Sequence, residues 1–143
     1  MFLIFIFVFI TRVVDAGVTT ILPVPVLYED QFVKLTTKNL ILKWYFFPCG
    51  NQKTIPLENI ESFFREPVSM LSAKGWGMAL SNVWYACDPQ RQFVSDQSHF
   101  LSVGVKGGAV RKGFSVENFA KFEKALAGAK SRDDSTLTID NRE

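Results

Sequence analysis

The feature that most constrains this chain is a change in the period of its apolar residues close to residue 115. Upstream, apolar and polar side chains alternate as they do in strands, for example from Leu40 to Trp44. Downstream, from Val116 to Leu126, the apolar residues follow helical spacing. Ser115 is the expected N-cap of this helix and Gly128 its expected end. The sequence therefore predicts an α+β fold that is mostly β, with one amphipathic helix at the C-terminal end.

Turn-forming residues divide the β-rich part into about six or seven strands. Lys38-Asn39 predicts the turn of a first hairpin, and Lys106-Gly107-Gly108 predicts the turn of a last one, because asparagine and glycine tolerate positive φ. Between them, "KTIPLENIESFF" predicts a strand that continues past a bend after Leu57. The run "MALSNVWYA" predicts one further strand, which ends at Asp88-Pro89.

The two ends of the chain are expected to lie outside the folded domain, which we place at residues 28–128. Residues 1–16 begin with an apolar run that is shorter than the roughly 20 residues of a membrane span but suits a secretory signal cleaved before Gly17. A mis-assigned start codon and an uncleaved anchor are the alternatives, because no basic residue precedes the run. Residues 17–27, with Pro23 and Pro25, predict an extended linker, and residues 129–143 predict a disordered tail.

Length and charge limit the classes of partner. The 143 residues, of which 48% are hydrophobic and 21% charged, are enough for one ordinary globular domain with a buried core. A net charge of +2 is too small to indicate nucleic-acid binding, which needs a dense basic face. We therefore expect no nucleic-acid partner. The protein would be secreted if the leader is a genuine signal peptide, and cytoplasmic or membrane-peripheral otherwise.

Residues that could support catalysis are scarce. The chain has a single histidine, His99, and neither a Gly-x-Ser-x-Gly nor a His-Glu-x-x-His motif. Cys49 and Cys87 lack the Cys-x-x-Cys spacing of redox and zinc sites. They form either a structural disulfide, which would add roughly 3 to 4 kcal/mol on the chain-entropy model, or two ordinary thiols. We expect no enzyme activity, no cofactor and no metal.

The order of strands followed by one C-terminal helix resembles the pleckstrin-homology-like (PH-like) superfold, and in particular small domains of the bacterial-PH type. "KTIPLENIESFF" is similar to the family's third strand, and "FLSVGVKGGAVRKGFSVENFAKFEKAL" to its last hairpin and helix. "KGWGMALSNVWYACDPQR" is similar to family members with a central Gly-Trp-Gly segment. The resemblance implies a bent antiparallel barrel of about seven strands, capped at one end by the helix. It implies no particular function, because one fold hosts many kinds of site.

Two groups of basic residues are candidate contacts for an anion or an anionic lipid. They are Lys34, Lys38 and Lys43 around the first hairpin, and Lys106, Arg111 and Lys112 around the last. The glycine-rich run from Gly104 to Phe119 lacks the Gly-Lys-Ser/Thr of a phosphate-binding loop at its helix start, which favours a hairpin turn over a phosphate site.

Aromatic residues are the remaining candidates for binding. Trp44, Trp76 and Trp84, with Tyr45 and Tyr85, either pack in the core or build a groove for a peptide. An open sheet edge could also accept a peptide strand. The sequence thus favours a non-enzymatic PH-like binding or accessory domain that recognises a protein or peptide. The alternatives are a module that binds anionic lipid surfaces, and a secreted, disulfide-stabilised domain with an extracellular partner.

Overall fold

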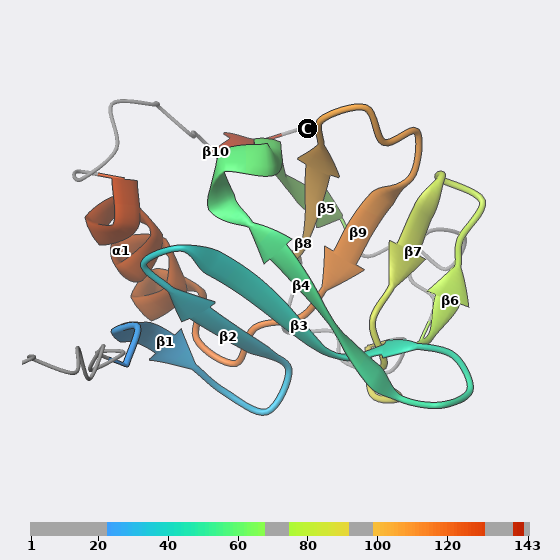
Figure 1. Cartoon of the computed structure of the whole chain (residues 1–143). Coiled ribbons are helices and arrows are strands. Elements are labelled where there is room, and N and C mark those ends of the chain that lie inside the picture. The colour runs from blue at the N-terminus through green and yellow to red at the C-terminus, as the bar shows by residue number, and fades with distance from the viewer. Residues whose placement is uncertain (1–22, 68–74, 92–98, 131–138, 142–143) are drawn as a thin grey trace, which may run out of the picture.

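The structure, a computed structural model, describes residues 23–67, 75–91, 99–130 and 139–141. The predicted leader at residues 1–16 and residues 17–22 of the predicted linker lie outside these ranges, so they stay predictions. Val26 and Leu27, predicted as the end of the linker, are instead the first two residues of a strand, Val26–Glu29. The described chain is mostly β with one helix near its C-terminal end (Figure 1), which confirms the predicted fold class.

The first sheet is a four-stranded antiparallel meander in the order β1-β2-β3-β4. Its strands are β1 (Val26–Glu29), β2 (Val33–Thr36), β3 (Asn39–Phe46) and β4 (Asn51–Pro56). The first predicted hairpin is confirmed, since Leu35 of β2 pairs with Leu40 of β3 across the turn at Lys38. The predicted bend is also confirmed, because a 3₁₀ turn, η1 (Leu57–Asn59), follows β4 and leads the chain into the second sheet.

The second sheet has the strand order β10-β5-β8-β9-β7-β6. Its strands are β5 (Ile60–Pro67), β6 (Gly77–Met78), β7 (Val83–Tyr85), β8 (His99–Val105), β9 (Arg111–Phe114) and β10 (Ile139–Asn141). β7 runs parallel to β9, and β10 parallel to β5, whereas the other pairs are antiparallel. Within the described ranges no strand pairing joins this sheet to the first, so the strands form two sheets and not one closed barrel.

Two local predictions in the second sheet need correction. The run predicted as one strand, "MALSNVWYA", is a hairpin: Ala79 N–H donates to Val83 O at 2.9 Å, and Asn82 adopts a φ of 61°. The turn between β8 and β9 is longer than a two-residue turn, spanning residues 106–110, and only Gly107 of its two glycines has a positive φ, 71°. In both places a polar residue or glycine in the left-handed region reverses the chain, as expected for such turns.

The tail also differs from the prediction. Residues 139–141 form β10, which pairs in parallel with Phe63–Arg65 of β5. The prediction of a disordered tail over 129–143 is therefore wrong for these three residues. The polarity of the tail concealed this strand, although Ile139 of β10 packs against the core.

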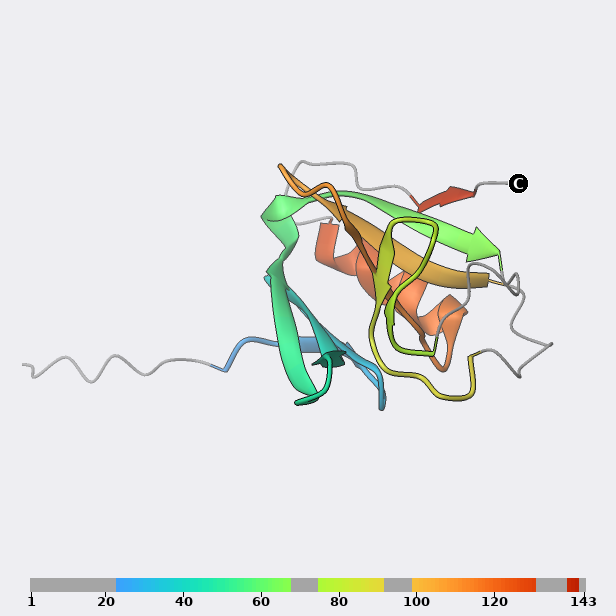
Figure 2. The same ribbon diagram turned by 90° about the vertical axis from the view of Figure 1, so that its right-hand side faces the viewer.

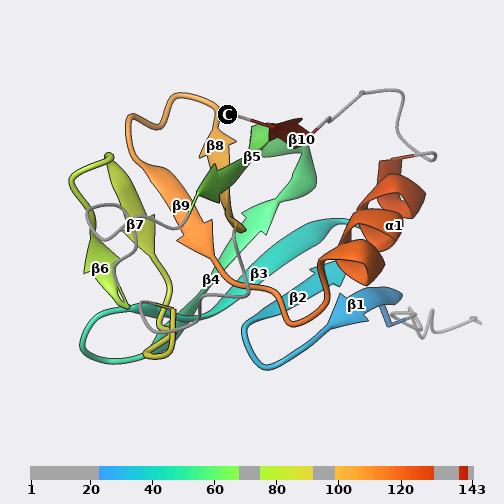
Figure 3. The same cartoon turned by 180° about the vertical axis from the view of Figure 1, so that it is seen from behind.

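The core lies between the two sheets and the helix α1 (Phe119–Lys130). Phe122 of α1 is fully buried, and its ring contacts Tyr28, Phe63 and Phe114 at centroid distances of 5.5, 6.4 and 5.8 Å. These three rings come from both sheets, so one helical side chain ties the layers together. α1 lies beside β1 and β2 at the end of the molecule opposite β6 and β7 (Figures 1 and 3), and Figure 2 shows it behind the second sheet.

The helix begins later than the sequence predicts. Its N-cap is Asn118, whose Oδ1 accepts the N–H of Lys121 at 3.0 Å, and not Ser115. Ser115 is 1% exposed and bonds to other buried side chains. The helix also continues past Gly128 to Lys130. In the sequence alone, Ser115 suits the cap position as well as Asn118 does. In the fold, however, the Ser115 hydroxyl is bonded to Asp88 and is not available to cap the helix.

Candidate functional site

The basic residues of the first hairpin are partly neutralised by one carboxylate. Lys43 Nζ donates to Glu29 Oε1 at 2.9 Å, and Lys34 Nζ lies 3.5 Å from Glu29 Oε2. The hydrogen bond from Lys43 is the main cause that lowers the pKa of Glu29 below its usual value. The structure thus brings Lys34 and Lys43 together, but around an acid that competes with any external anion.

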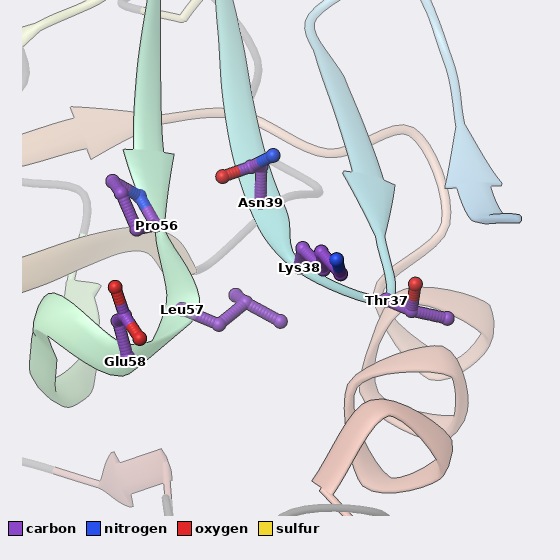
Figure 4. Close-up of a pocket in the computed structure, with 6 residues that line it drawn as sticks. All are labelled: Thr37, Lys38, Asn39, Pro56, Leu57 and Glu58. Carbon is purple, nitrogen blue, oxygen red and sulfur yellow. The ribbon is translucent and has the colours of Figure 1, made fainter. Parts of the chain in front are cut away.

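Lys38, the third residue of that group, lies on the rim of a separate pocket (Figure 4). The pocket has a volume of about 440 Å³ and is lined by Thr37, Lys38, Asn39, Pro56, Leu57 and Glu58. Its two charged side chains are of opposite sign, which gives no net attraction for an anion. It lies where the β2–β3 turn meets η1, and it offers little to a ligand besides these surface groups.

The basic residues of the last hairpin do not converge. Arg111 donates to Ser102 Oγ at 3.3 Å and lies over the ring of Phe64, with 5.0 Å from its guanidinium carbon to the ring centroid. Lys112, the next residue of β9, points to the opposite face of the sheet, as strand neighbours do, and its Nζ donates to Val110 O at 2.5 Å. Lys106 is exposed in the turn. The structure therefore places Arg111 and Lys112 on opposite faces of the sheet, each already bonded to an oxygen of the protein.

The aromatic residues instead form the most distinctive surface of the described chain. Phe47 is 62% exposed, Trp44 58% and Phe46 41%. Tyr45, whose ring contacts those of Phe46 and Trp84, is only 5% exposed. Burial raises the pKa of the Tyr45 hydroxyl. We use the name aromatic cluster for Trp44, Tyr45, Phe46, Phe47, Trp76 and Trp84. It corrects the predicted set, because Tyr85 belongs to a separate buried group with Ala79 and Val83.

A bulge in β3 presents the aromatic cluster to solvent. The register between β3 and β4 shifts between Leu42 and Phe46, and Trp44 within this shift has a φ of 53°. Strand alternation would place Trp44 on the same buried face as Leu40 and Leu42, but Trp44 is exposed and Tyr45 is buried instead. A bulge re-aims side chains in this way. The Trp44 ring lies against Gly50, where a Cβ would come within 2.8 Å of it. Gly50 has a φ of 72° and no side chain, so both the turn and the ring depend on glycine here.

Hydrogen bonds between distant segments hold the aromatic cluster in place. The indole N–H groups of Trp76 and Trp84 both donate to the carbonyl oxygen of Tyr45 at 3.1 Å. The N–H of Cys87 donates to Trp44 O at 2.9 Å. Phe47 packs edge-on against Trp76 with ring centroids 5.0 Å apart. The indole N–H groups of Trp76 and Trp84 are therefore hydrogen-bonded inside the protein, which holds their rings in place. The exposed rings lie at the end of the molecule opposite α1.

Two lysines border the aromatic cluster. Lys53 Nζ lies 5.4 Å from the ring centroid of Phe46 and 5.6 Å from that of Tyr45. Lys112 pairs in register with Trp84, and its pKa is lowered first by burial and then by the positive charge of Lys53. Both ion pairs found among the described residues involve Glu29, so neither of these lysines is paired with a carboxylate there.

A second polar group, not predicted from the sequence, is buried and structural. Ser115 Oγ donates to Asp88 Oδ2 at 2.6 Å and accepts from Arg91 Nε at 3.2 Å. Arg91, 1% exposed, also donates to Ala86 O at 3.0 Å. Burial lowers the pKa of Arg91 to about 10. These bonds hold residues 86–91 against the end of β9. Asp88-Pro89 gave only a turn signal, and nothing in the sequence marks Arg91 as buried.

The remaining candidates give no reactive centre. Cys49 and Cys87 are free cysteines, so the structure contains no disulfide between them, and burial raises the pKa of Cys87. His99 is the first residue of β8, and the structure describes its backbone but not its side chain. No group of three or more His, Cys, Asp or Glu side chains that could hold a metal occurs in the described ranges. In the same ranges, no helix is long and apolar enough to cross a membrane.

Comparisons with known proteins add no relative. No family model matches the chain, and neither a curated protein nor a solved structure is significantly similar to it.

Proposed function

We propose that this chain is a non-enzymatic binding or accessory domain that recognises a protein or peptide through the aromatic cluster. The observation that carries the proposal is the exposure of Trp44, Phe46 and Phe47 on a surface held by hydrogen bonds. Exposed aromatic patches on soluble domains mark binding sites, and aromatic residues dominate binding hot spots. A pre-ordered surface also loses less side-chain entropy when it binds.

The exposed rings can supply useful binding energy. Covering the exposed halves of Trp44 and Phe47 would remove on the order of 100 Å² of apolar surface from water for each. At about 25 cal/mol per Å², the two rings together contribute about 5 kcal/mol before the costs of association. That amount fits recognition of a short peptide or of one patch on a protein, and it needs no cofactor.

For the fold we propose a PH-like domain of the small bacterial-PH type. The order of a four-stranded meander, a second sheet and a helix supports this assignment. In this reading the bent sheets are an opened barrel and α1 is the capping helix. The cellular location depends on residues 1–16: the domain would be secreted if they are a signal peptide, and cytoplasmic or membrane-peripheral otherwise.

A lipid surface is the second candidate, because exposed aromatic rings beside Lys53 also suit the boundary of an anionic membrane. We place it second because Lys34 and Lys43 of the predicted lipid-binding group share Glu29, and Arg111 is bonded to Ser102. A secreted domain stabilised by a Cys49–Cys87 bond is the third candidate, and it requires an oxidation that this structure does not contain.

Photo-crosslinking from a single position tests the proposed function. A benzophenone amino acid replaces Phe47 in the full chain, which is expressed in its native cells and irradiated. The matched control carries the same amino acid at Leu80, which is 89% exposed but lies at the β6–β7 turn, away from the β3–β4 turn (Figure 1). We expect discrete protein adducts from position 47 that are absent from position 80. Adducts to lipid alone, or identical adducts from both positions, would contradict the proposal, and turnover in a substrate screen would contradict its non-enzymatic part.

A further inference from the structure

The charge around the aromatic cluster is of one sign. The segments that build it, residues 44–54, 75–87 and 109–113, contain no aspartate or glutamate, and Asp88, which follows the second segment, is buried and accepts a hydrogen bond from Ser115. They carry Lys53, Arg111 and Lys112, and the first and last of these have no carboxylate partner in the described part of the chain. Lys112 pairs in register with Trp84, whose ring centroid lies 6.4 Å from that of Tyr45, and Lys53 Nζ lies 5.6 Å from the same Tyr45 ring. The two cations therefore border the same pair of aromatic residues although they belong to different sheets.

Lys53 also lies on an open strand edge. β4 is the outer strand of the first sheet and pairs only with β3 among the described residues. Its other edge therefore presents backbone N–H and C=O groups that a strand from another molecule could pair with. An extended peptide offers these groups a matching ladder of backbone donors and acceptors, which a lipid surface does not. This edge favours a peptide over a membrane as the occupant.

From the positive charge, the open edge of β4 and the aromatic cluster together, we infer that the partner is an acidic, extended peptide segment. The segment pairs with the edge of β4, places its carboxylates at Lys53 and Lys112, and places its apolar side chains on the aromatic cluster. The inference rests on the proposed function and names the chemistry of the partner.

Selection from a random peptide library separates this inference from the proposed function. The full chain is immobilised and panned with displayed random peptides of about twelve residues, in parallel with the variant Trp44→Ala/Phe47→Ala. We expect peptides enriched only by the wild-type chain, and enriched in aspartate and glutamate relative to the input library. Enrichment that depends on the cluster but lacks acidic residues would overturn the inference and leave the proposed function intact. Absence of any cluster-dependent enrichment would overturn both, as would binding only to vesicles of phosphatidylcholine and phosphatidylserine.

Charge reversal then tests the two lysines with a selected peptide carrying a fluorophore. We expect Lys53→Glu/Lys112→Glu to raise the Kd about tenfold or more in fluorescence anisotropy, and the matched control Lys121→Glu/Lys124→Glu on exposed positions of α1 to leave it unchanged. Because Lys112 is partly buried, Lys53→Glu alone and the wild-type salt dependence provide the same test if the double variant does not fold. Equal Kd values in about 0.05 M and about 0.5 M NaCl would overturn the inference.

N-methylation of the peptide tests the strand pairing. A peptide strand uses its N–H groups for pairing at every second residue. Methylation at one alternating set of positions should abolish binding, and methylation at the other set should leave it within about twofold. Equal tolerance of both sets would rule out pairing with β4.

Discussion

The sharpest structural prediction concerns Ser115, because the sequence and the structure give it different roles. As an N-cap, its replacement by alanine would cost about 1 kcal/mol. In the structure it bridges Asp88 and Arg91, which are 5% and 1% exposed. Ser115→Ala would remove one hydrogen bond from Asp88 and two from Arg91, both buried charged groups, at about 1.5 to 3 kcal/mol per bond.

Other bonds survive the substitution and reduce its cost. Arg91 keeps Ala86 O as an acceptor, and Asp88 keeps the N–H of Gln90 as a donor. We therefore expect Ser115→Ala to lower the free energy of unfolding by about 3 kcal/mol rather than by the sum of all these bonds. The measurement is urea denaturation followed by tryptophan fluorescence, with Asn118→Ala, the true cap, expected to cost about 1 kcal/mol.

Aspartate at position 115 distinguishes the two roles further. Aspartate is a good N-cap, so Ser115→Asp would preserve stability if Ser115 capped the helix. Beside buried Asp88 it would add a second carboxylate, and we expect it to destabilise at least as much as alanine. A Ser115→Ala cost of about 1 kcal/mol together with a stable Ser115→Asp variant would refute the buried network.

Three further predictions follow from single contacts. Gly113→Ala should lower the free energy of unfolding by about 2 kcal/mol in chemical denaturation, because the new Cβ would lie 2.3 Å from a core tyrosine ring, whereas Gly128→Ala meets open space and should not destabilise. Burial and the hydrogen bond to an aspartate raise the pKa of Tyr28 to about 12. The stability that this contributes is therefore present below pH 10 and should fall as the pH rises from 10 towards 12. A Tyr28→Phe variant that lost as much stability as the wild type over this window would contradict this prediction. Maleimide should modify exposed Cys49 faster than Cys87, whose pKa is raised by burial, and intact mass unchanged by reductant would confirm that no disulfide joins them.

The candidate site was only partly predictable. The sequence named the tryptophans and Tyr45 as alternatives for a core or a groove, and the structure divides them, with Trp44 exposed and Tyr45 buried. That division depends on the β3 bulge, which no local pattern in "NLILKWYFF" marks. Lys53 was not a candidate, because its position over two rings requires the register of β4 against β3. The predicted basic groups do not form an anion site, because Glu29 pairs with Lys34 and Lys43, and Ser102 accepts a hydrogen bond from Arg111.

By itself, the sequence determined the first hairpin, the bend after β4 and the C-terminal helix: alternation of side chains indicated the strands, asparagine and glycine the turns, and helical spacing the helix. These depend on residues a few positions apart, so local composition carries them. Only the tertiary structure decided what each polar group does. Asp30 accepts the N–H of Glu117, and Trp84 donates to Tyr45 across 39 positions, so the partners are set by how the two sheets and the helix meet. A hydroxyl or an indole N–H bonds to whichever group packing brings near it, and that choice has no signature in the neighbouring sequence.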